Sequence, residues 1–411
     1  MPLLKFVPRP YKLFNKIQYY EWGTRDAHAF IPEFLGIAPQ PDTPYAELWI
    51  GAHPKAPSEI QIDDRRVPLN EIIAEFGRDS LGEYVSKKFS GRLPFLLKVL
   101  SAAEALSIQT HPNKDQAVKL HASYPDKYPD DNHKPETAIA LDSLTALVGF
   151  KPAAKIAATL RALPELREYA EGRLIDRLME SEKTGDLEKA IRELYADIMR
   201  KAEDKEKLSS CVIKIRGRLA RKTSPAPEEI QFLKQYDVYG ADVGLLSFFF
   251  FNLVHLKRGQ AIFTDAGVPH AYIKGNIVEC MANSDNVVRA GLTNKFRDVE
   301  TLLDILKYEF RDCEILNSGQ KMDEFTYKTK AEEFQITRFK KEAGFKKICR
   351  SNDRPSVCLI TGGEIEIVWS HAGMDYLHSF SKGESFFIPA FLSEYRMSSI
   401  GETDFFNVEI P

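Results

Sequence analysis

Three short segments of this chain each place two chemically active side chains two residues apart, beside a proline. The pairs are Gln109 with His111, Lys134 with Glu136, and His270 with Tyr272. In an extended strand the side chains at positions i and i+2 leave the same face, so each pair points in one direction. Pro135 favours an extended conformation for the residue before it, which suits this geometry. A fold that brings the three strands together therefore creates one polar site.

The three pairs together offer two imidazoles, one carboxylate and one amide oxygen. These donors belong to Gln109, His111, Glu136 and His270, and they suit a divalent metal of borderline hardness. Zinc is the first candidate, because nitrogen and carboxylate ligands with room left for substrate describe a catalytic zinc site. Taken singly, each histidine is more often a surface or hydrogen-bonded residue than a ligand. Three such pairs in one chain favour a metal site.

The motifs around these pairs resemble those of the type I phosphomannose isomerases. They are Tyr-Ala-Glu-Leu-Trp-Ile-Gly-Ala-His-Pro (45–54), Gln-Thr-His-Pro-Asn-Lys (109–114), His-Lys-Pro-Glu (133–136), Asp-Ala-Gly-Val-Pro-His-Ala-Tyr (265–272) and Asn-Ser-Asp-Asn-Val-Val-Arg-Ala-Gly-Leu-Thr (283–293). The resemblance extends in order over residues 10–310. It implies a cupin fold, one zinc ion per chain, and interconversion of mannose 6-phosphate and fructose 6-phosphate through an enediol intermediate.

An aldose–ketose exchange of this kind moves one proton between C1 and C2 of the sugar. The metal would act as a Lewis acid on the developing oxyanion, directly or through water. Proton transfer needs a base, and Lys134, Tyr272 and Glu279 are the candidates, with Glu279 the weaker one. The sequence does not choose among them.

The resemblance also implies that Arg289 is an active-site residue. Its guanidinium can bind phosphate or the enediolate in a bidentate fork. The chain has no Gly-rich phosphate loop, so side chains have to bind the phosphate, and Ser107 and Lys295 are further candidates. A solvated surface charge explains Lys295 equally well.

Composition restricts the class of protein and its partners. The chain has 411 residues, enough for two or three domains, and its 56 basic and 59 acidic residues nearly balance. This balance predicts no nucleic-acid or membrane partner. Five cysteines without Cys-x-x-Cys spacing favour a reducing compartment, the start lacks a secretory pattern, and the apolar run at 245–256 is too short to span a bilayer. We expect a cytoplasmic monomer that binds a small-molecule sugar phosphate.

The pattern along the chain predicts a mainly β fold with an α insertion. Residues 1–150 and 244–320 form a discontinuous catalytic cupin domain, which includes one helix near 69–76 and another over 299–306. Residues 151–243 form a helical insertion, because apolar residues such as Leu187, Ile191 and Leu194 follow a helical stripe. Residues 321–411 form a non-catalytic, cupin-like domain. The fold expected is thus two cupin-like antiparallel β-barrels plus a helical domain.

A weak internal repeat connects the two β regions. Residues 257–263 resemble residues 381–387 at an offset of 124. The same offset places Glu394 at the position of His270 and Arg396 at that of Tyr272, so the second copy lacks the site residues. Gly362 and Gly363 lie between two apolar runs and predict a hairpin.

Two other functions compete with the isomerase. Two histidines and one glutamate also bind non-haem iron, so the chain could be a cupin metal-dependent oxygenase. Gln109, Lys134 and Arg289 argue against that choice. A non-catalytic sugar-phosphate binding protein is the second alternative, and the complete set of candidate residues argues against it.

Overall fold

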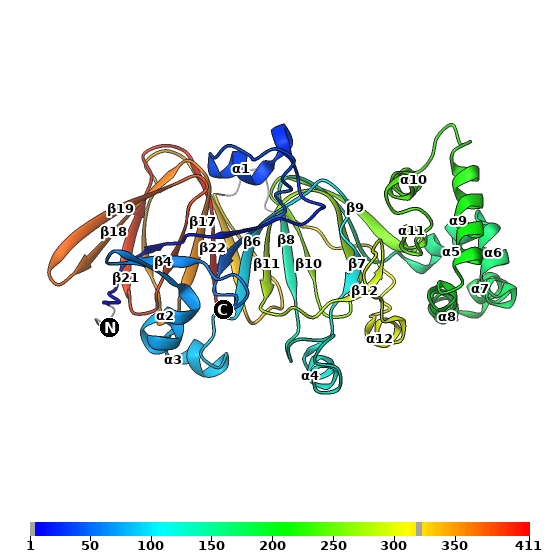
Figure 1. The fold of residues 1–411 in the computed structure, drawn as a ribbon, viewed down its shortest axis with the longest axis horizontal. Helices are drawn as coiled ribbons and strands as arrows, with labels where there is room; N and C mark the ends of the chain where they lie inside the picture. The colour runs from blue at the N-terminus through cyan, green and yellow to red at the C-terminus, as the bar shows by residue number, and fades with distance from the viewer. Residues whose placement is uncertain (1–4, 318–322) are drawn as a thin grey trace.

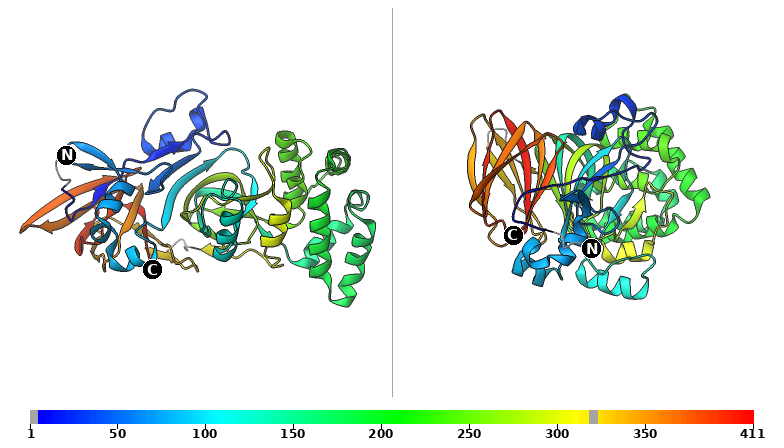
Figure 2. Two further views of the ribbon diagram at one scale, coloured as in Figure 1. Left: turned by 60° about the horizontal axis from the view of Figure 1, so that its bottom comes forward. Right: turned by 60° about the vertical axis from the view of Figure 1, so that its left-hand side comes forward.

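The elements of the chain form three groups along its longest axis. The structure is a computed structural model that describes residues 5–317 and 323–411. The C-terminal strands lie at one end, a large sheet that includes β6, β8, β10 and β11 lies in the middle, and the helices α5–α10 lie at the other end (Figure 1). Two further views show the same separation (Figure 2). The fold is mainly β, with several antiparallel sheets.

The middle group is one ten-stranded sheet. Its strands are β2 (Lys16–Gln18), β3 (Glu47–Gly51), β6 (Phe95–Ala102), β7 (Ile108–Thr110), β8 (Glu136–Phe150), β9 (Phe251–Lys257), β10 (Gln260–Thr264), β11 (His270–Ala282), β12 (Val288–Gly291) and β13 (Leu316–Asn317). The order is β13-β10-β8-β11-β6-β3-β2, while β9 pairs with β8, and β7 pairs with both β11 and β12. The apolar run at 93–100 forms most of β6, in which every residue is buried.

The C-terminal group consists of two sheets. One contains β1 (Tyr11–Lys12), β14 (Glu324–Tyr327), β15 (Gln335–Lys341), β17 (Ser356–Gly362), β20 (Ser385–Ile388) and β22 (Thr403–Glu409). The other contains β16 (Lys346–Arg350), β18 (Glu364–His371), β19 (Met374–Ser381) and β21 (Glu394–Ser398). β1 pairs with β20 in this group, although residues 1–150 were expected in the catalytic domain. Tyr11 lies opposite Phe387, and both side chains enter one core. β4 (Glu59–Ile62) and β5 (Arg65–Pro68) form a separate two-stranded sheet.

The pairing of the strands repeats between the middle and C-terminal groups. β8 pairs with β9, β10 and β11. In the C-terminal group β17 pairs with β20 and β22, and β18 pairs with β19 and β21. β17 and β18 thus correspond to β8, β19 to β9, β20 to β10, and β21 with β22 to β11. Phe263 lies opposite Thr137 on β8, as Phe387 lies opposite Val357 on β17. These registers support the repeat at offset 124.

The offset does not hold for the side chains of β21. Tyr395 and Met397 enter the C-terminal core, while Glu394 and Arg396 are exposed. Because successive side chains of a strand alternate between faces, a shift of one residue exchanges the two sets. The expected equivalence of Glu394 with His270 and of Arg396 with Tyr272 is therefore wrong by one residue.

The predicted hairpin at Gly362 and Gly363 is also wrong. β17 and β18, on either side of these glycines, belong to different sheets and do not pair. Gly363 has a φ of 72°, and an added Cβ would collide with the main-chain oxygen of Glu402, so a glycine is needed where the chain passes between sheets. The hairpin lies one strand later, where Ala372 and Gly373 connect β18 to β19 with φ values of 52° and 79°.

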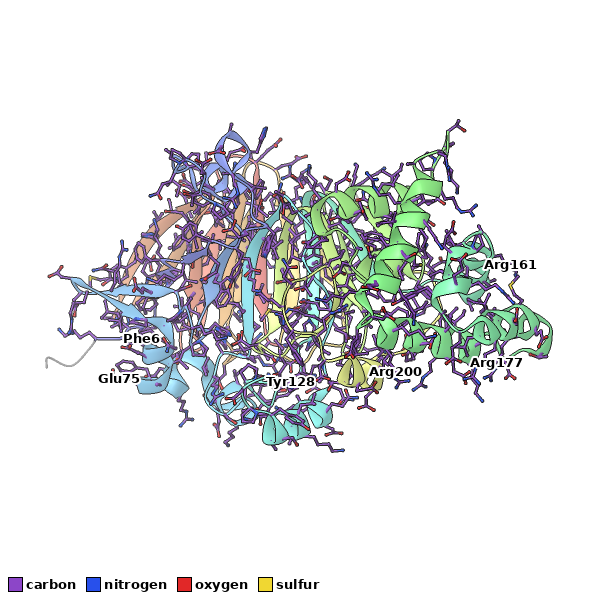
Figure 3. All side chains as sticks on the ribbon, turned by 45° about the vertical axis from the view of Figure 1, so that its right-hand side comes forward. Phe6, Glu75, Tyr128, Arg161, Arg177 and Arg200 are labelled. Atoms are coloured by element: carbon purple, nitrogen blue, oxygen red, sulfur yellow. The ribbon has the colours of Figure 1, made fainter. Side chains whose placement is uncertain are left out.

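The helices α5–α10 form the group farthest from the C-terminal strands, and the other helices lie around the sheets (Figure 1). In chain order the helices are η1 (Asp26–His28), α1 (Phe30–Leu35), α2 (Leu69–Glu75), α3 (Gly77–Lys88), α4 (Lys114–Ser123), α5 (Ala153–Arg161), α6 (Glu165–Tyr169), α7 (Gly172–Thr184), α8 (Leu187–Lys201), α9 (Lys205–Leu219), α10 (Pro227–Tyr239), α11 (Gly244–Ser247) and α12 (Val299–Ile305). α2 and α12 match the two helices expected outside the insertion, but α1, α3 and α4 were not expected within residues 1–150. Figure 3 shows Arg161, Arg177 and Arg200 among the helices of the insertion.

Apolar cores join the three groups. The buried stripe of α8, with Ile191 and Leu194, packs in one cluster with Phe150 and Ile273 from the outer face of the middle sheet. A second cluster joins residues of the middle sheet, such as Val278, to β17, β20 and β22 of the C-terminal group. No helix of the described residues is long and apolar enough to cross a membrane.

Candidate metal centre and active site

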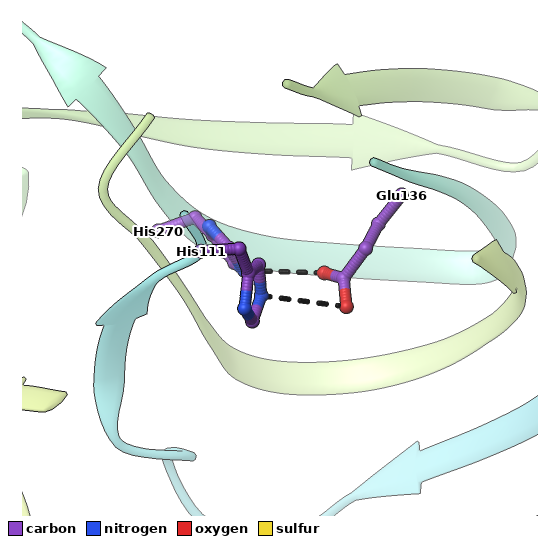
Figure 4. Close-up of side chains that lie close together, drawn as sticks. All are labelled: His111, Glu136 and His270. Atoms are coloured by element: carbon purple, nitrogen blue, oxygen red, sulfur yellow. Dashed lines mark ion pairs between the residues drawn. The ribbon is translucent and has the colours of Figure 1, made fainter. Parts of the chain in front are cut away.

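Three predicted metal ligands meet at the ends of three strands. His111 directly follows β7, Glu136 is the first residue of β8, and His270 is the first residue of β11. One ligand atom from each lies within 4.8 Å of the others. Nε2 of His111 is 3.5 Å from Oε1 of Glu136, and Nε2 of His270 is 3.1 Å from Oε2 (Figure 4). We call these three residues the metal triad.

A proline lies next to each triad residue in the sequence and marks the end of its strand. Pro112 follows His111, Pro135 precedes Glu136, and Pro269 precedes His270. Proline has no main-chain N–H, so it is excluded from the interior of a hydrogen-bonded ladder and marks the strand ends. The ligands therefore lie at the ends of their strands.

The triad has the properties of a metal site. His111, Glu136 and His270 are 1 to 2% exposed, yet Nε2 of both imidazoles and Oε2 of Glu136 have no hydrogen-bond partner. Buried polar atoms are rarely left without partners, and a divalent ion satisfies all three atoms at once. The donor set of two imidazoles and one carboxylate suits zinc.

Main-chain carbonyl groups orient the two imidazoles. Nδ1 of His111 lies 2.7 Å from the oxygen of Asn286, and Nδ1 of His270 lies 3.0 Å from the oxygen of Val268. A carbonyl oxygen only accepts, so each Nδ1 carries the proton and donates it. Each Nε2 then presents its lone pair to the metal position, which is the usual arrangement of metal-binding histidines.

Gln109 lies beside the triad. It is directly opposite His270 on β11 and Arg289 on β12. Residues opposite one another in an antiparallel pair point to the same face, so the three side chains form one row. Its amide is thus on the face of the triad, and its role as a fourth ligand stays a prediction.

Lys134 supplies a positive charge to the triad. Its Nζ lies 3.2 Å from Oε1 of Glu136. Burial alone would raise the pKa of Glu136, but Lys134 and His111 lower it well below its usual range. Burial lowers the pKa of His111 to about 4. An ionised carboxylate beside a neutral imidazole is the protonation state that binds a metal.

A second group of buried charges lies on β3, β6 and β11. Nζ of Lys98 is 3.1 Å from Glu279 and 3.6 Å from Glu47. The hydroxyl group of Tyr272 donates to Glu279 at 2.9 Å, and Nε1 of Trp49 donates to Glu47 at 2.5 Å. We call these five residues the Lys98 group. It connects to the triad through Tyr272, which is two residues from His270.

Burial and neighbouring charges shift the pKa values in this group. Burial raises the pKa of Glu279, and the positive charge of Lys98 only partly offsets that rise. Burial would lower the pKa of Lys98, but Glu47 and Glu279 raise it. Tyr272 has a strongly raised pKa because of burial and Glu279. At neutral pH, Tyr272 and Lys98 therefore keep their protons.

Lys98 was not predicted as a site residue from the sequence. It stands within the apolar run 93–100, where the only signal is one charge in a strand that is otherwise apolar. Charged residues are almost never fully buried unless they are paired, so this lysine implied a buried partner.

Asp285 was not predicted as a site residue, and the structure pairs it with two residues of the 45–55 region. Its carboxylate lies 2.8 Å from Nζ of Lys55 and 3.7 Å from Nε2 of His53. Burial lowers the pKa of His53, and Lys134 adds to that effect while Asp285 opposes it. Burial would raise the pKa of Asp285, but the positive charges around it, including that of Lys134, lower it. His53 and Asp285 both belong to motifs that carried the family resemblance.

The phosphate candidates occupy different environments. Arg289 is half-buried, forms no ion pair with a carboxylate of the described residues, and has a pKa lowered by burial. A half-buried guanidinium without a partner is suited to an anionic ligand. Ser107 is half-buried just before β7. Lys295 is exposed in the loop after β12, and its role in binding phosphate stays a prediction.

The fold and the site define a class of protein: a mainly antiparallel β enzyme with a candidate divalent metal centre and adjacent acid–base groups. Comparison with protein-family models matches residues 11–153 to the catalytic domain of type I phosphomannose isomerase. A probable mannose-6-phosphate isomerase of Echinococcus multilocularis is 43% identical over 314 aligned residues, and the match covers 71% of this chain and 71% of that protein. The mannose-6-phosphate isomerase of Cryptococcus neoformans is 37% identical over 401 residues, covering 87% of this chain and 90% of that protein.

Solved structures agree with these relatives. A mutant of phosphomannose isomerase from Salmonella typhimurium has a TM-score of 0.85 and 29% identity, covering 97% of this chain and 98% of its own. A mannose 6-phosphate isomerase bound with zinc and yttrium has a TM-score of 0.84 at 29% identity, with the same coverage. The chain belongs to the type I phosphomannose isomerases. It is an enzyme, an aldose–ketose isomerase of mannose 6-phosphate.

Proposed function

We propose that the chain interconverts mannose 6-phosphate and fructose 6-phosphate through an enediol intermediate, with one zinc ion per chain. The observation that carries the zinc proposal is the buried triad, in which Nε2 of two imidazoles and Oε2 of Glu136 lack hydrogen-bond partners. The related enzyme bound with zinc supports the choice of metal. His111, Glu136 and His270 would hold the ion, with Gln109 as the fourth ligand.

We further propose that the middle sheet and the C-terminal sheets are two cupin-like barrels. The repeated pairing of β8–β11 in β17–β22 supports this proposal. Only the first copy has the triad at its strand ends, so the second is the non-catalytic copy.

When bound, zinc supplies positive charge that stabilises the oxyanion of the enediolate. Lys134 and the Tyr272–Glu279 pair hold the exchangeable protons next to the triad, and they are the groups proposed to move the proton between C1 and C2. Tyr272 donates to Glu279 and keeps its proton at neutral pH, which favours Lys134 or Glu279 as the base. Burial of these groups excludes water, which strengthens each electrostatic contact.

Arg289 is proposed to bind the phosphate or the enediolate. Its row with Gln109 and His270 places its side chain on the face of the triad, and its charge has no protein partner among the described residues. Ser107 and Lys295 are proposed as additional phosphate-binding residues. The substrate-binding face thus carries the positive charge that a sugar phosphate needs.

Two further points belong to the proposal. We infer a monomer whose partner is a small-molecule sugar phosphate, with no nucleic-acid or membrane partner. The cytoplasm is the proposed compartment, because all five cysteines are free thiols in the structure and such chains are typical of reducing environments. Light scattering of the purified protein tests the oligomeric state.

The central experiment measures metal content and turnover together. We expect about one zinc per chain by elemental analysis, and loss of mannose 6-phosphate isomerisation on chelation. His111→Ala and His270→Ala should lose both metal and turnover. The control is His371→Ala, in β18 of the C-terminal sheets, which should lose neither. Full turnover by protein shown to be metal-free contradicts the zinc proposal, and iron-dependent oxygen uptake would support an oxygenase instead.

A further inference from the structure

The carbonyl group that orients His111 comes from a distant part of the chain. His270 is oriented by Val268, only two residues away on the same segment. His111 depends on Asn286, which lies 175 residues further along the sequence. Asn286 belongs to the 283–287 loop, which connects β11 to β12. The orientation of the His111 imidazole therefore depends on the position of that loop.

One carboxylate holds the 283–287 loop in place. Oδ1 of Asp130 accepts from the hydroxyl group of Ser284 at 2.8 Å and from the side-chain amide of Asn286 at 3.1 Å. Oδ2 accepts from the main-chain N–H of Asp285 at 2.7 Å. The hydroxyl group of Ser284 also accepts from the main-chain N–H of Asn286 at 3.1 Å. Three consecutive loop residues thus bind to the carboxylate of Asp130, either directly or through Ser284.

The amide of Asn286 fixes the same loop from the other side. Its Nδ2 donates to the main-chain oxygens of Asp130 at 2.7 Å and Asn132 at 2.9 Å. Asn286 is 0% exposed, so water does not replace these donors and acceptors. Oδ1 of Asn286 has no hydrogen-bond partner among the described residues, but the buried contacts of its Nδ2 and of Asp130 restrict the backbone of the loop. The carbonyl oxygen of Asn286 is consequently held 2.7 Å from Nδ1 of His111.

The segment that carries Asp130 is itself anchored. Tyr128, two residues earlier, is 2% exposed, and its hydroxyl group donates to Asp298 at 3.1 Å. The main-chain oxygen of Tyr128 lies 2.7 Å from Nδ1 of His121 in α4. Figure 3 shows Tyr128 where α4 approaches the middle sheet. Asp130 therefore acts from a fixed position.

We propose that Asp130 is a positioning residue for the metal centre. It holds the 283–287 loop so that the carbonyl group of Asn286 keeps the proton of His111 on Nδ1 and directs Nε2 toward the metal. Asp130 does not itself reach the triad. This inference rests on the proposed function, since it assumes that His111 binds the metal. Outer partners of metal-binding histidines typically change metal affinity by about 10- to 100-fold.

Asp130→Asn tests the proposal with little change of shape. An amide presents one acceptor where the carboxylate presented two, so the contacts to Asp285 and to the Ser284–Asn286 pair are not both kept. We expect zinc affinity, measured by competition with a chromophoric chelator, to fall by about 10- to 100-fold. Turnover should recover when zinc is raised to saturate the site, because no ligand is lost.

Asp131→Ala is the matched control. Asp131 is the next residue, its side chain is 64% exposed, and it forms only a 3.7 Å pair with Lys114. This variant should bind zinc as the parent does. Asn286→Ala removes the amide that contacts Asp130 but keeps the carbonyl group that His111 uses. Because both changes release the same loop, Asp130→Asn with Asn286→Ala should lose little more affinity than the weaker-binding single variant.

A second readout needs no metal. In the metal-free parent, nitrogen–proton correlation spectra of the histidine rings should show His111 as a single Nδ1–H tautomer, and Asp130→Asn should add the Nε2–H form. If the parent itself binds no zinc, the proposed function fails. If the parent binds zinc and Asp130→Asn binds it within threefold with an unchanged tautomer, the positioning role of Asp130 is refuted. Equal losses in Asp131→Ala, or additive losses in the double variant, also refute it.

Discussion

Replacing Lys98 by methionine removes the only positive charge of the Lys98 group while keeping an unbranched side chain of similar length. Glu47 and Glu279 then lie buried without a counter-charge, and one of them has to take up a proton. For a carboxyl group with an ordinary pKa of about 4.3, this proton costs about 4 kcal/mol at pH 7 and about 1 kcal/mol at pH 5. Breaking a buried ion pair by removing one partner costs about 3–5 kcal/mol. We therefore expect Lys98→Met to lower the free energy of unfolding by about 3–5 kcal/mol at pH 7.

The pH dependence identifies the cause of this loss. The folded variant holds a proton that the unfolded chain releases above about pH 4.3, so the variant becomes less stable relative to the parent as the pH rises from about 4.3 to 7. The loss should shrink to about 1 kcal/mol at pH 5. Adding Glu279→Gln removes the carboxyl group that takes up the proton, so the double variant should lack this pH dependence.

Urea unfolding at pH 5, 6 and 7, followed by circular dichroism, measures the effect. Lys16→Met is the control, because Lys16 lies opposite Trp49 on the neighbouring strand but is 42% exposed and pairs at the surface with Glu59. It should cost at most about 1 kcal/mol, without the same pH dependence. A Lys98→Met variant as stable as the parent, or a loss that is equal at pH 5 and pH 7, would refute the reasoning.

Three further predictions address turnover and acid stability. Arg289→Ala should raise the activation free energy that corresponds to kcat/KM by about 2–4 kcal/mol, because a charge-assisted contact to the transition state is lost. Metal content should stay unchanged, and loss of metal would instead indicate a structural role. Lys134→Arg keeps the positive charge beside Glu136, but arginine does not exchange its proton near neutral pH. Most turnover and most solvent-proton exchange at C2 should therefore be lost while metal is retained, and normal turnover would leave Glu279 as the favoured base. Glu333 lies 2.6 Å from Nε2 of His133; burial would raise its pKa, but the contact with His133 lowers it. The ionised carboxylate of Glu333 stabilises the folded state above a pH of about 4.3, and this contribution is lost as the pH falls through the lowered pKa. Glu333→Gln should therefore lower the free energy of unfolding by about 1.5–3 kcal/mol at pH 5.5. It should also make the free energy of unfolding less sensitive to acid.

Much of the metal centre could be predicted from local sequence. A pair such as Gln109 and His111 shares a face because strand geometry alone alternates side chains. Proline next to each triad residue marks the strand ends, which is where the structure places them. The apolar stripe of α8 likewise follows from helical periodicity. These signals depend only on residues that are close in the sequence, so they can be recognised without the tertiary structure.

The position of the strands relative to one another could not be predicted in this way. Lys98 is an isolated charge in an apolar run until β6 lies between β3 and β11, with Trp49 on one side and Glu279 on the other. Gly362 and Gly363 have the composition of a hairpin, but the neighbouring main chain at Glu402 makes them a passage between sheets. The one-residue shift at β21 could not be detected from the sequence similarity of the two copies, because it changes the face on which a side chain lies without changing the composition of the strand.

The sequence by itself determined which residues could bind a metal and move a proton, and it indicated the helical insertion and the mainly β character of the rest, but not α1, α3 or α4. The tertiary structure decided which of these groups are buried together, including the Lys98 group and the contact of Asp130 with the 283–287 loop. The reason is that backbone preferences act locally, whereas register and burial depend on packing between segments far apart in the sequence. A charge such as that of Lys98 acquires its partners only from that packing.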